Sequence, residues 1–141
     1  MENKRIAFEP FISDQERKFI VDGVDFYNVA MTGIHDWCPV NFLLRGERND
    51  VRGGLLGQLW GGWLQIFHLW VAKTERGQGY GSHLLKEAET YALSRGAVGA
   101  TLETYSFQAK PFYERLGCEI CGMVEGYPPS QIKFFLKKTL T

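Results

Sequence analysis

The spacing of apolar residues in the first part of the chain predicts a short strand followed by a helix. Residues 5–8 form a strand candidate that Pro10 ends. Ser13 and Glu16 then have the spacing of a capping box, and apolar side chains recur at helical spacing over the following turns. Gly23 interrupts this pattern, so the segment is either one bent helix or two helices.

Beyond this region, apolar runs between glycines, prolines and charged residues predict a series of strands with two further helices. The glycine pair at 61–62 joins two strand-like runs, which favours a tight hairpin. Leu84, Leu85 and Ala88 begin an apolar stripe at helical spacing, and Gly96 stands where a helix C-cap is expected. The predicted strands are 40–45, 52–59, 63–71, 98–105, 118–124 and 131–137, and the predicted helices are 82–95 and 108–116.

The order of these elements is β-α-β-β-β-α-β-α-β-β, in which an antiparallel first half leads into a βαβ unit. A mixed sheet covered by helices is therefore expected. The length of 141 residues fits one domain, 1–141. Hydrophobic residues make up 45% of the chain, enough to fill a core of that size.

Charge and composition exclude several classes of protein. Sixteen basic residues balance sixteen acidic ones, which argues against a nucleic-acid-binding surface and against a polybasic membrane anchor. No apolar run approaches the roughly 20 residues that span a bilayer, and the first ten residues lack an apolar signal region. Three cysteines are too few for a disulfide scaffold, so we expect reduced thiols in a cytoplasmic protein.

The segment Arg76–Gly81, with the sequence RGQGYG, carries the clearest chemical signal. Three glycines between a strand and a helix let backbone N–H groups converge, and the helix adds its free N–H groups and its dipole, so the segment can cradle a pyrophosphate. It is not a P-loop, because Gly81-Ser82 lacks the lysine of that motif, and its glycine spacing does not fit the dinucleotide-binding fingerprint. An ordinary glycine-rich connection remains the alternative for the loop by itself.

A second segment favours the pyrophosphate-binding interpretation of the loop over an ordinary glycine-rich connection. Residues 109–119, with the sequence AKPFYERLGCE, follow the loop at a distance of one helix and one strand. Together with Leu69–Val71 and the loop, they resemble the GNAT superfamily of acetyl-CoA-dependent N-acyltransferases over residues 50–137. The resemblance implies an α/β (α+β) fold: a mixed, mostly antiparallel sheet of six to seven strands, helices on both faces, and a central splay between two parallel strands.

The resemblance also implies where acetyl-CoA binds, with no metal involved. The loop and the following residue would bind the CoA pyrophosphate, and the preceding strand would pair with the pantetheine arm. Many relatives have asparagine where this chain has Ser106, so Gln108 is an alternative contact to pantetheine. The implied cofactor-binding residues are Leu69, Trp70, Val71, Arg76, Gly77, Gln78, Gly79, Tyr80, Gly81, Ser82, Ser106 and Gln108.

Two residues are the predicted catalytic groups. Tyr113 matches the family tyrosine, which would donate a proton or hydrogen bond to the departing thiolate; a core aromatic is the alternative. Glu103 lies in an apolar strand next to the expected splay and ranks first as the general base, with a solvent-facing carboxylate as the alternative. His68 and Glu125 are the other candidates for the base.

Aromatic and acidic residues outside the loop suggest how an acceptor amine would be bound. An aromatic wall with carboxylates suits an ammonium group through cation–π attraction and ion pairing. The candidates for this role are Trp37, Tyr105, Glu125 and Tyr127, with Tyr27, His35 and Asp36 as further candidates. Zinc is not expected, because Cys118 and Cys121 would point to opposite faces of one strand.

The sequence therefore predicts an N-acetyltransferase that moves an acetyl group from acetyl-CoA to a primary amine of a small molecule through a ternary complex. The alternative is a GNAT-fold module that binds acyl-CoA, as a ligand or sensor, without transferring it. The last predicted strand and the exposed aromatics would also suit a homodimer.

Overall fold

A computed structural model describes all 141 residues as two compact units, 1–35 and 36–141, and each is described by itself. The first contains α1 (Asp14–Thr32), one continuous helix. Its capping box is present: Ser13 Oγ accepts from the Glu16 N–H at 3.0 Å, and the Glu16 side chain accepts from the Ser13 N–H at 2.9 Å. The strand predicted at 5–8 is wrong, because those residues pair with no other strand.

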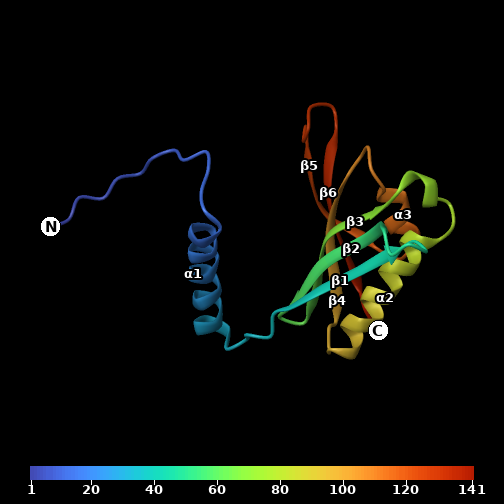
Figure 1. The fold of residues 1–141 in the computed structure, drawn as a ribbon, viewed down its shortest axis with the longest axis horizontal. Helices are drawn as coiled ribbons and strands as arrows, with labels where there is room; N and C mark the ends of the chain where they lie inside the picture. The colour runs from blue at the N-terminus through green and yellow to red at the C-terminus, as the bar shows by residue number, and fades with distance from the viewer. The chain divides into compact units, whose positions relative to one another are not determined.

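The second unit contains a six-stranded sheet with two α-helices and one 3₁₀ turn (Figure 1). The strand order is β1-β2-β3-β4-β6-β5, and only β3 and β4 are parallel. This confirms the predicted mixed, mostly antiparallel sheet, and each predicted strand and helix of this unit begins and ends within two residues of its predicted bounds. The elements are β1 (Cys38–Arg45), β2 (Val51–Trp60), β3 (Trp63–Val71), η1 (Lys73–Glu75), α2 (Tyr80–Ser94), β4 (Gly99–Tyr105), α3 (Lys110–Arg115), β5 (Glu119–Glu125) and β6 (Ile132–Thr139).

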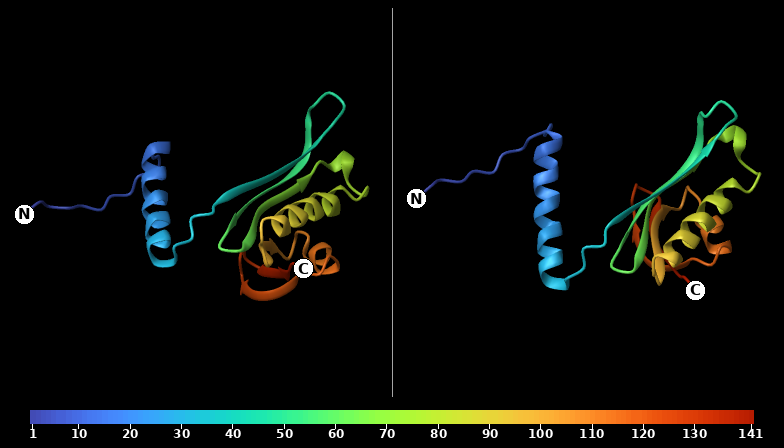
Figure 2. Two further views of the ribbon diagram at one scale, coloured as in Figure 1. Left: turned by 90° about the horizontal axis from the view of Figure 1, so that it is seen from below. Right: turned by 60° about the horizontal axis from the view of Figure 1, so that its bottom comes forward.

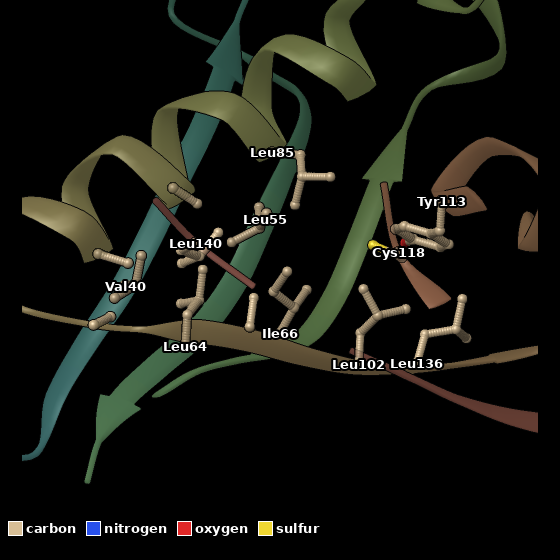
Figure 3. Close-up of a cluster of buried hydrophobic side chains, with 14 of the residues drawn as sticks. Val40, Leu55, Leu64, Ile66, Leu85, Leu102, Tyr113, Cys118, Leu136 and Leu140 are labelled. Atoms are coloured by element: carbon tan, nitrogen blue, oxygen red, sulfur yellow. The ribbon is translucent and has the colours of Figure 1, made fainter. Parts of the chain in front are cut away.

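The hydrophobic core lies between α2 and one face of the sheet. Figure 2 shows α2 running across β1, β2 and β3, the three strands with which it makes most of its contacts. Alternate residues of each strand point towards the helix, so Leu55 and Leu64 are fully buried and belong to the same core cluster as Leu85 of α2 (Figure 3). No helix combines the length and apolarity needed to cross a bilayer.

The β2–β3 hairpin turns at Gly61 and Gly62, as the sequence predicts. Their φ angles are 61° and 82°, a left-handed conformation at both central positions that favours glycine. The hairpin register then changes once: Leu56 faces His68 while Gly57 faces Ile66, so Phe67 is an extra residue in β3. Such a bulge reverses which residues face the core. Leu64 and Ile66 face it before the bulge, whereas Leu69 and Val71 pack against it afterwards.

The parallel strands β3 and β4 separate beyond this bulge. Their pairing runs from Trp63 with Gly99 to Ile66 with Leu102 and then stops. β3 continues to Val71 and β4 to Tyr105 without pairing to each other. The predicted splay between two parallel strands is therefore present, and it leaves one edge of β3 free to bind something else.

Candidate active site

A cavity of about 1020 Å³ opens where the splay meets the start of α2 and the helix α3. It brings together the end of β3, the glycine loop, the end of β4 and the tyrosine segment, which are far apart in the sequence. Among the predicted site residues, its lining includes Leu69, Trp70, Val71, Arg76, Gly77, Gly79, Tyr80, Gly81, Ser82, Glu103, Gln108 and Tyr113.

The glycine loop forms one wall of this cavity. Gly77 and Gly79 have φ angles of 79° and 85°, and Gly79 is the N-cap of α2. The first helical bond of α2 is donated by the His83 N–H to the Gly79 carbonyl at 3.0 Å, so the N–H groups of residues 80–82 have no acceptor within the helix. These donors and the positive end of the helix dipole make the loop suitable for an anion.

Two contacts fix the loop in this position. The Arg76 side chain donates from Nε to the Val71 carbonyl at 2.9 Å, which ties the loop back to the end of β3. On the other side, Gly81 lies against Phe112 of α3, where an added Cβ would be 3.3 Å from the ring. Phe112 is not among the predicted site residues, although it stands next to Tyr113 in the tyrosine segment.

Tyr113 combines burial with access to the cavity. Its residue surface is only 7% exposed, and it packs in the core beside Cys118 (Figure 3). Burial, with a smaller contribution from the Cys118 thiol, raises the pKa of Tyr113 to about 12. The phenol therefore stays protonated at neutral pH. A thiol ionises near pH 8.5, so Tyr113 is suited to donate a hydrogen bond to a thiolate rather than to transfer its proton outright.

This pKa predicts how Tyr113 affects stability at alkaline pH. The unfolded phenol ionises near pH 10 and the folded one near 12, so between these values only the unfolded chain loses the proton. The free energy of unfolding should fall there by on the order of 1 kcal/mol per pH unit. Tyr113→Phe lacks this proton, so melting the two proteins at about pH 9 and about pH 11 should show the Tm difference, wild type minus variant, shrinking. An unchanged difference would contradict the burial of the phenol.

Glu103 and His68 lie on either side of the splay. Both residues line the large cavity and also a second cavity of about 250 Å³. The Glu103 side chain is half exposed, and its Oε2 accepts from the Lys133 ammonium at 2.8 Å. Glu103 therefore reaches the splay and is also paired. Lys133 carries no motif in the sequence, because the contact depends on the pairing of β4 with β6.

Gln108 lines the large cavity, whereas Ser106 does not. Gln108 accepts hydrogen bonds at Oε1 from the Thr104 hydroxyl and the Tyr105 N–H, which leaves its amide N–H groups as donors. Ser106 is committed elsewhere: its hydroxyl donates to the Gln131 side chain and accepts from the Ile132 N–H. Ser106 thus fastens the start of β6, and Gln108 has the better position for a ligand.

The predicted acceptor-binding residues lie outside the cavity lining. Trp37 stacks on Trp60 with ring centroids 4.9 Å apart. Tyr105 contacts the ring of Tyr127, at 5.8 Å, and both rings lie around the ammonium of Lys133. Glu125 is exposed at the end of β5. Gln78, a predicted cofactor residue, is also absent from the lining.

Two further features bear on the chemistry of the site. No group of three or more His, Cys, Asp or Glu side chains could hold a metal ion.

Thr104 and Phe67, which also line the cavity, are not among the predicted site residues. Their only signal in the sequence is their neighbourhood in β4 and β3, since neither carries a motif.

Comparison with known proteins agrees with this geometry. The profile of the acetyltransferase (GNAT) family matches residues 8–118. Blasticidin-S acetyltransferase of Streptomyces morookaense is 40% identical over 96 residues, which are 67% of this chain and 71% of that protein. Acetyltransferase Atu2258 of Agrobacterium fabrum is 36% identical over 128 residues, 90% of this chain and 93% of that protein.

Solved structures agree as well. The crystal structure of an acetyltransferase from Agrobacterium tumefaciens has a TM-score of 0.90 and 32% identity, covering 96% of this chain and 99% of that one. The chain belongs to the GNAT family and is an acetyltransferase. This confirms the resemblance inferred from the loop and the tyrosine segment.

Proposed function

We propose that this protein transfers the acetyl group of acetyl-CoA directly to a primary amine of a small molecule. The observation that carries the proposal is that one cavity joins the glycine loop, an unpaired strand edge and a buried tyrosine. Acetyl-CoA is the donor used by the family. The loop suits the pyrophosphate of acetyl-CoA, the unpaired strand edge suits its extended arm, and the buried tyrosine suits its thioester.

The residues present fit this donor. The loop from Arg76 to Ser82, with Gly79 at its turn, would bind the pyrophosphate through backbone N–H groups. The free edge of Leu69–Val71 would pair with the amides of the pantetheine arm, as an added strand does. Gln108 would donate an amide hydrogen bond to the same arm. Backbone dipoles supply most of this binding, which explains how a chain with no net charge could hold a polyanion.

Tyr113 and Glu103 would divide the chemistry. The amine nitrogen forms a bond to the thioester carbonyl carbon, the C–S bond breaks, and CoA leaves as a thiolate. Tyr113 would stabilise the sulfur with a hydrogen bond, and Glu103, directly or through a water, would take the proton that the amine loses. The backbone N–H near Val71 would stabilise the carbonyl oxygen, and the cavity would hold the reactants together.

Acetyl-CoA binding and thiol release test this function together. We expect acetyl-CoA to raise the Tm, and we expect at least one amine to release free CoA thiol in a panel of blasticidin S, an aminoglycoside, a polyamine and amino acids. Blasticidin S is included because of the name of one relative. Acetyl-CoA at about millimolar concentration would reveal even weak binding. The absence of binding at that concentration would overturn the proposal. Binding without thiol release across the panel would favour a binding module instead.

Gln108 and Ser106 should differ in their effect on acetyl-CoA binding. Gln108→Leu should weaken affinity about fivefold, the value of one neutral hydrogen bond. Ser106→Ala should leave affinity within about twofold, because its hydroxyl serves the start of β6. Isothermal titration calorimetry measures both dissociation constants. A larger loss of affinity in Ser106→Ala than in Gln108→Leu would indicate that Ser106, and not Gln108, contacts pantetheine.

We also propose that residues 1–141 act as one domain, that the protein works in the cytoplasm without nucleic acid or membrane partners, and that it forms a homodimer. Nothing within the first unit covers the apolar side chains of α1, among them Phe19, Phe26 and Met31, which supports the last point. Apolar patches of this kind mark interaction surfaces. Light scattering after gel filtration would distinguish a dimer from a monomer.

A further inference from the structure

The ammonium group of Lys133 lies beside the proposed general base and is held from several sides. We propose that Lys133 is a positioning residue that fixes the carboxylate of Glu103 at the splay, so that its second oxygen is aimed at the acceptor amine. The proposal rests on the transfer reaction given above. If Lys133 has this role, the aromatic rings around its ammonium group are not available to the acceptor.

The position of Lys133 follows from the register of β4 and β6. Glu103 pairs with Phe135, and Tyr105 pairs with Lys133. Leu102 and Thr104 face the core, so alternation places Glu103 and Tyr105 on the opposite face of the sheet, together with Lys133 and Phe135. Lys133 and Glu103 are diagonal neighbours on that face, a distance that a lysine side chain can span.

Several contacts restrict the Lys133 side chain. Its Nζ lies 2.8 Å from Glu103 Oε2, and the side chain is only 16% exposed. The same atom lies 5.0 Å, 5.4 Å and 5.8 Å from the ring centroids of Tyr127, Phe135 and Tyr105. Aromatic faces attract a cation at such distances. The hydrogen bond to Glu103 raises the pKa of Lys133, so the group stays charged.

This arrangement uses only one of the two carboxylate oxygens of Glu103. One carboxylate oxygen is bound to Lys133, and the other remains an acceptor. Because Glu103 lines both cavities across the splay, a fixed carboxylate meets the reacting amine without first losing conformational freedom. The aromatic platform of Tyr105, Tyr127 and Phe135 already holds one ammonium, so the neutral amino group of the acceptor would donate to the free oxygen of Glu103 and would not bind to these rings.

Charge removal at Lys133 tests the proposal. Lys133→Met should lower kcat about tenfold with the acetyl-CoA KM within about twofold, the pattern expected when a catalytic group is misplaced. Lys133→Arg, which keeps the charge and can bind a carboxylate, should recover activity to within about threefold of wild type. The matched control is Lys137→Met, which removes a lysine from the same strand and face that pairs with Glu119 instead. It should behave like wild type.

The Glu103→Gln background shows whether Lys133 acts through Glu103. Glu103→Gln should lower kcat about 100-fold, and adding Lys133→Met should cause no further loss. As a readout independent of activity, NMR titration of the Lys133 side chain should give a lower pKa for Lys133 in Glu103→Gln than in wild type. The activity assays use the panel amine that wild type acetylates fastest.

The outcomes separate the inference from the function on which it rests. If wild type releases CoA thiol and Lys133→Met keeps its kcat, the positioning role is overturned while the transferase function stands. A full tenfold loss from Lys133→Met in the Glu103→Gln background would also overturn it, because Lys133 would then act elsewhere. A wild-type protein that acetylates no amine in the panel overturns both.

Discussion

Replacing Gly79 with alanine is expected to weaken acetyl-CoA binding about 100-fold, the loss of roughly two hydrogen bonds to a charged group. Gly79 adopts a φ of 85°, which L-residues with a side chain rarely adopt. A Cβ at this position would meet nothing within 4 Å, so the effect is conformational and not steric. The backbone should relax towards a negative φ, which turns the neighbouring N–H groups away from the cavity.

Gly62 provides a matched control for this experiment. It has a φ of 82° and equally open surroundings, but it lies in the β2–β3 hairpin and not in the cavity lining. Gly62→Ala should therefore cost a similar amount of stability, on the order of 1 kcal/mol, and leave the dissociation constant unchanged. Calorimetric titration and thermal melts measure both quantities. Equal affinities of the two variants for acetyl-CoA would show that the glycine loop does not bind the cofactor.

Local chemistry sets several parts of the fold that the sequence predicts correctly, whereas the mixed sheet follows from the order of the elements and its splay from the resemblance to the family. The paired glycines at 61–62 specify their hairpin, and the capping box specifies the start of α1, because each feature is determined within a few residues. The strand predicted at 5–8 fails for the opposite reason. A strand forms only when a neighbour pairs with it, and four residues say nothing about whether that neighbour exists.

The same distinction applies to the site. The glycine loop and Tyr113 belong to continuous motifs, so the order of residues along the chain is enough to predict that both line one cavity. The Lys133–Glu103 pair depends on the register of β4 against β6, which places residues 30 positions apart on one face. The choice of Gln108 over Ser106 likewise depends on three-dimensional contacts, namely the hydrogen bonds that tie Ser106 to the start of β6.

Tyr113→Phe should lower kcat about 100-fold, the cost of removing one donor aimed at developing charge. The acetyl-CoA dissociation constant should stay within about twofold, because the hydrogen bond to sulfur gains strength only as the thiolate forms. The ring keeps its place in the core beside Cys118, so the change removes the hydroxyl and little else.

Tyr91→Phe is the control for this change. The Tyr91 hydroxyl also makes specific contacts, accepting from the Arg95 guanidinium at 3.0 Å, but it lies outside the cavity lining. Losing it should leave kcat unchanged, and steady-state thiol release measures both variants. An unaltered kcat in Tyr113→Phe would show that the thiolate departs without help from Tyr113. Stabilisation of the leaving group would then have to come from backbone N–H groups or from solvent.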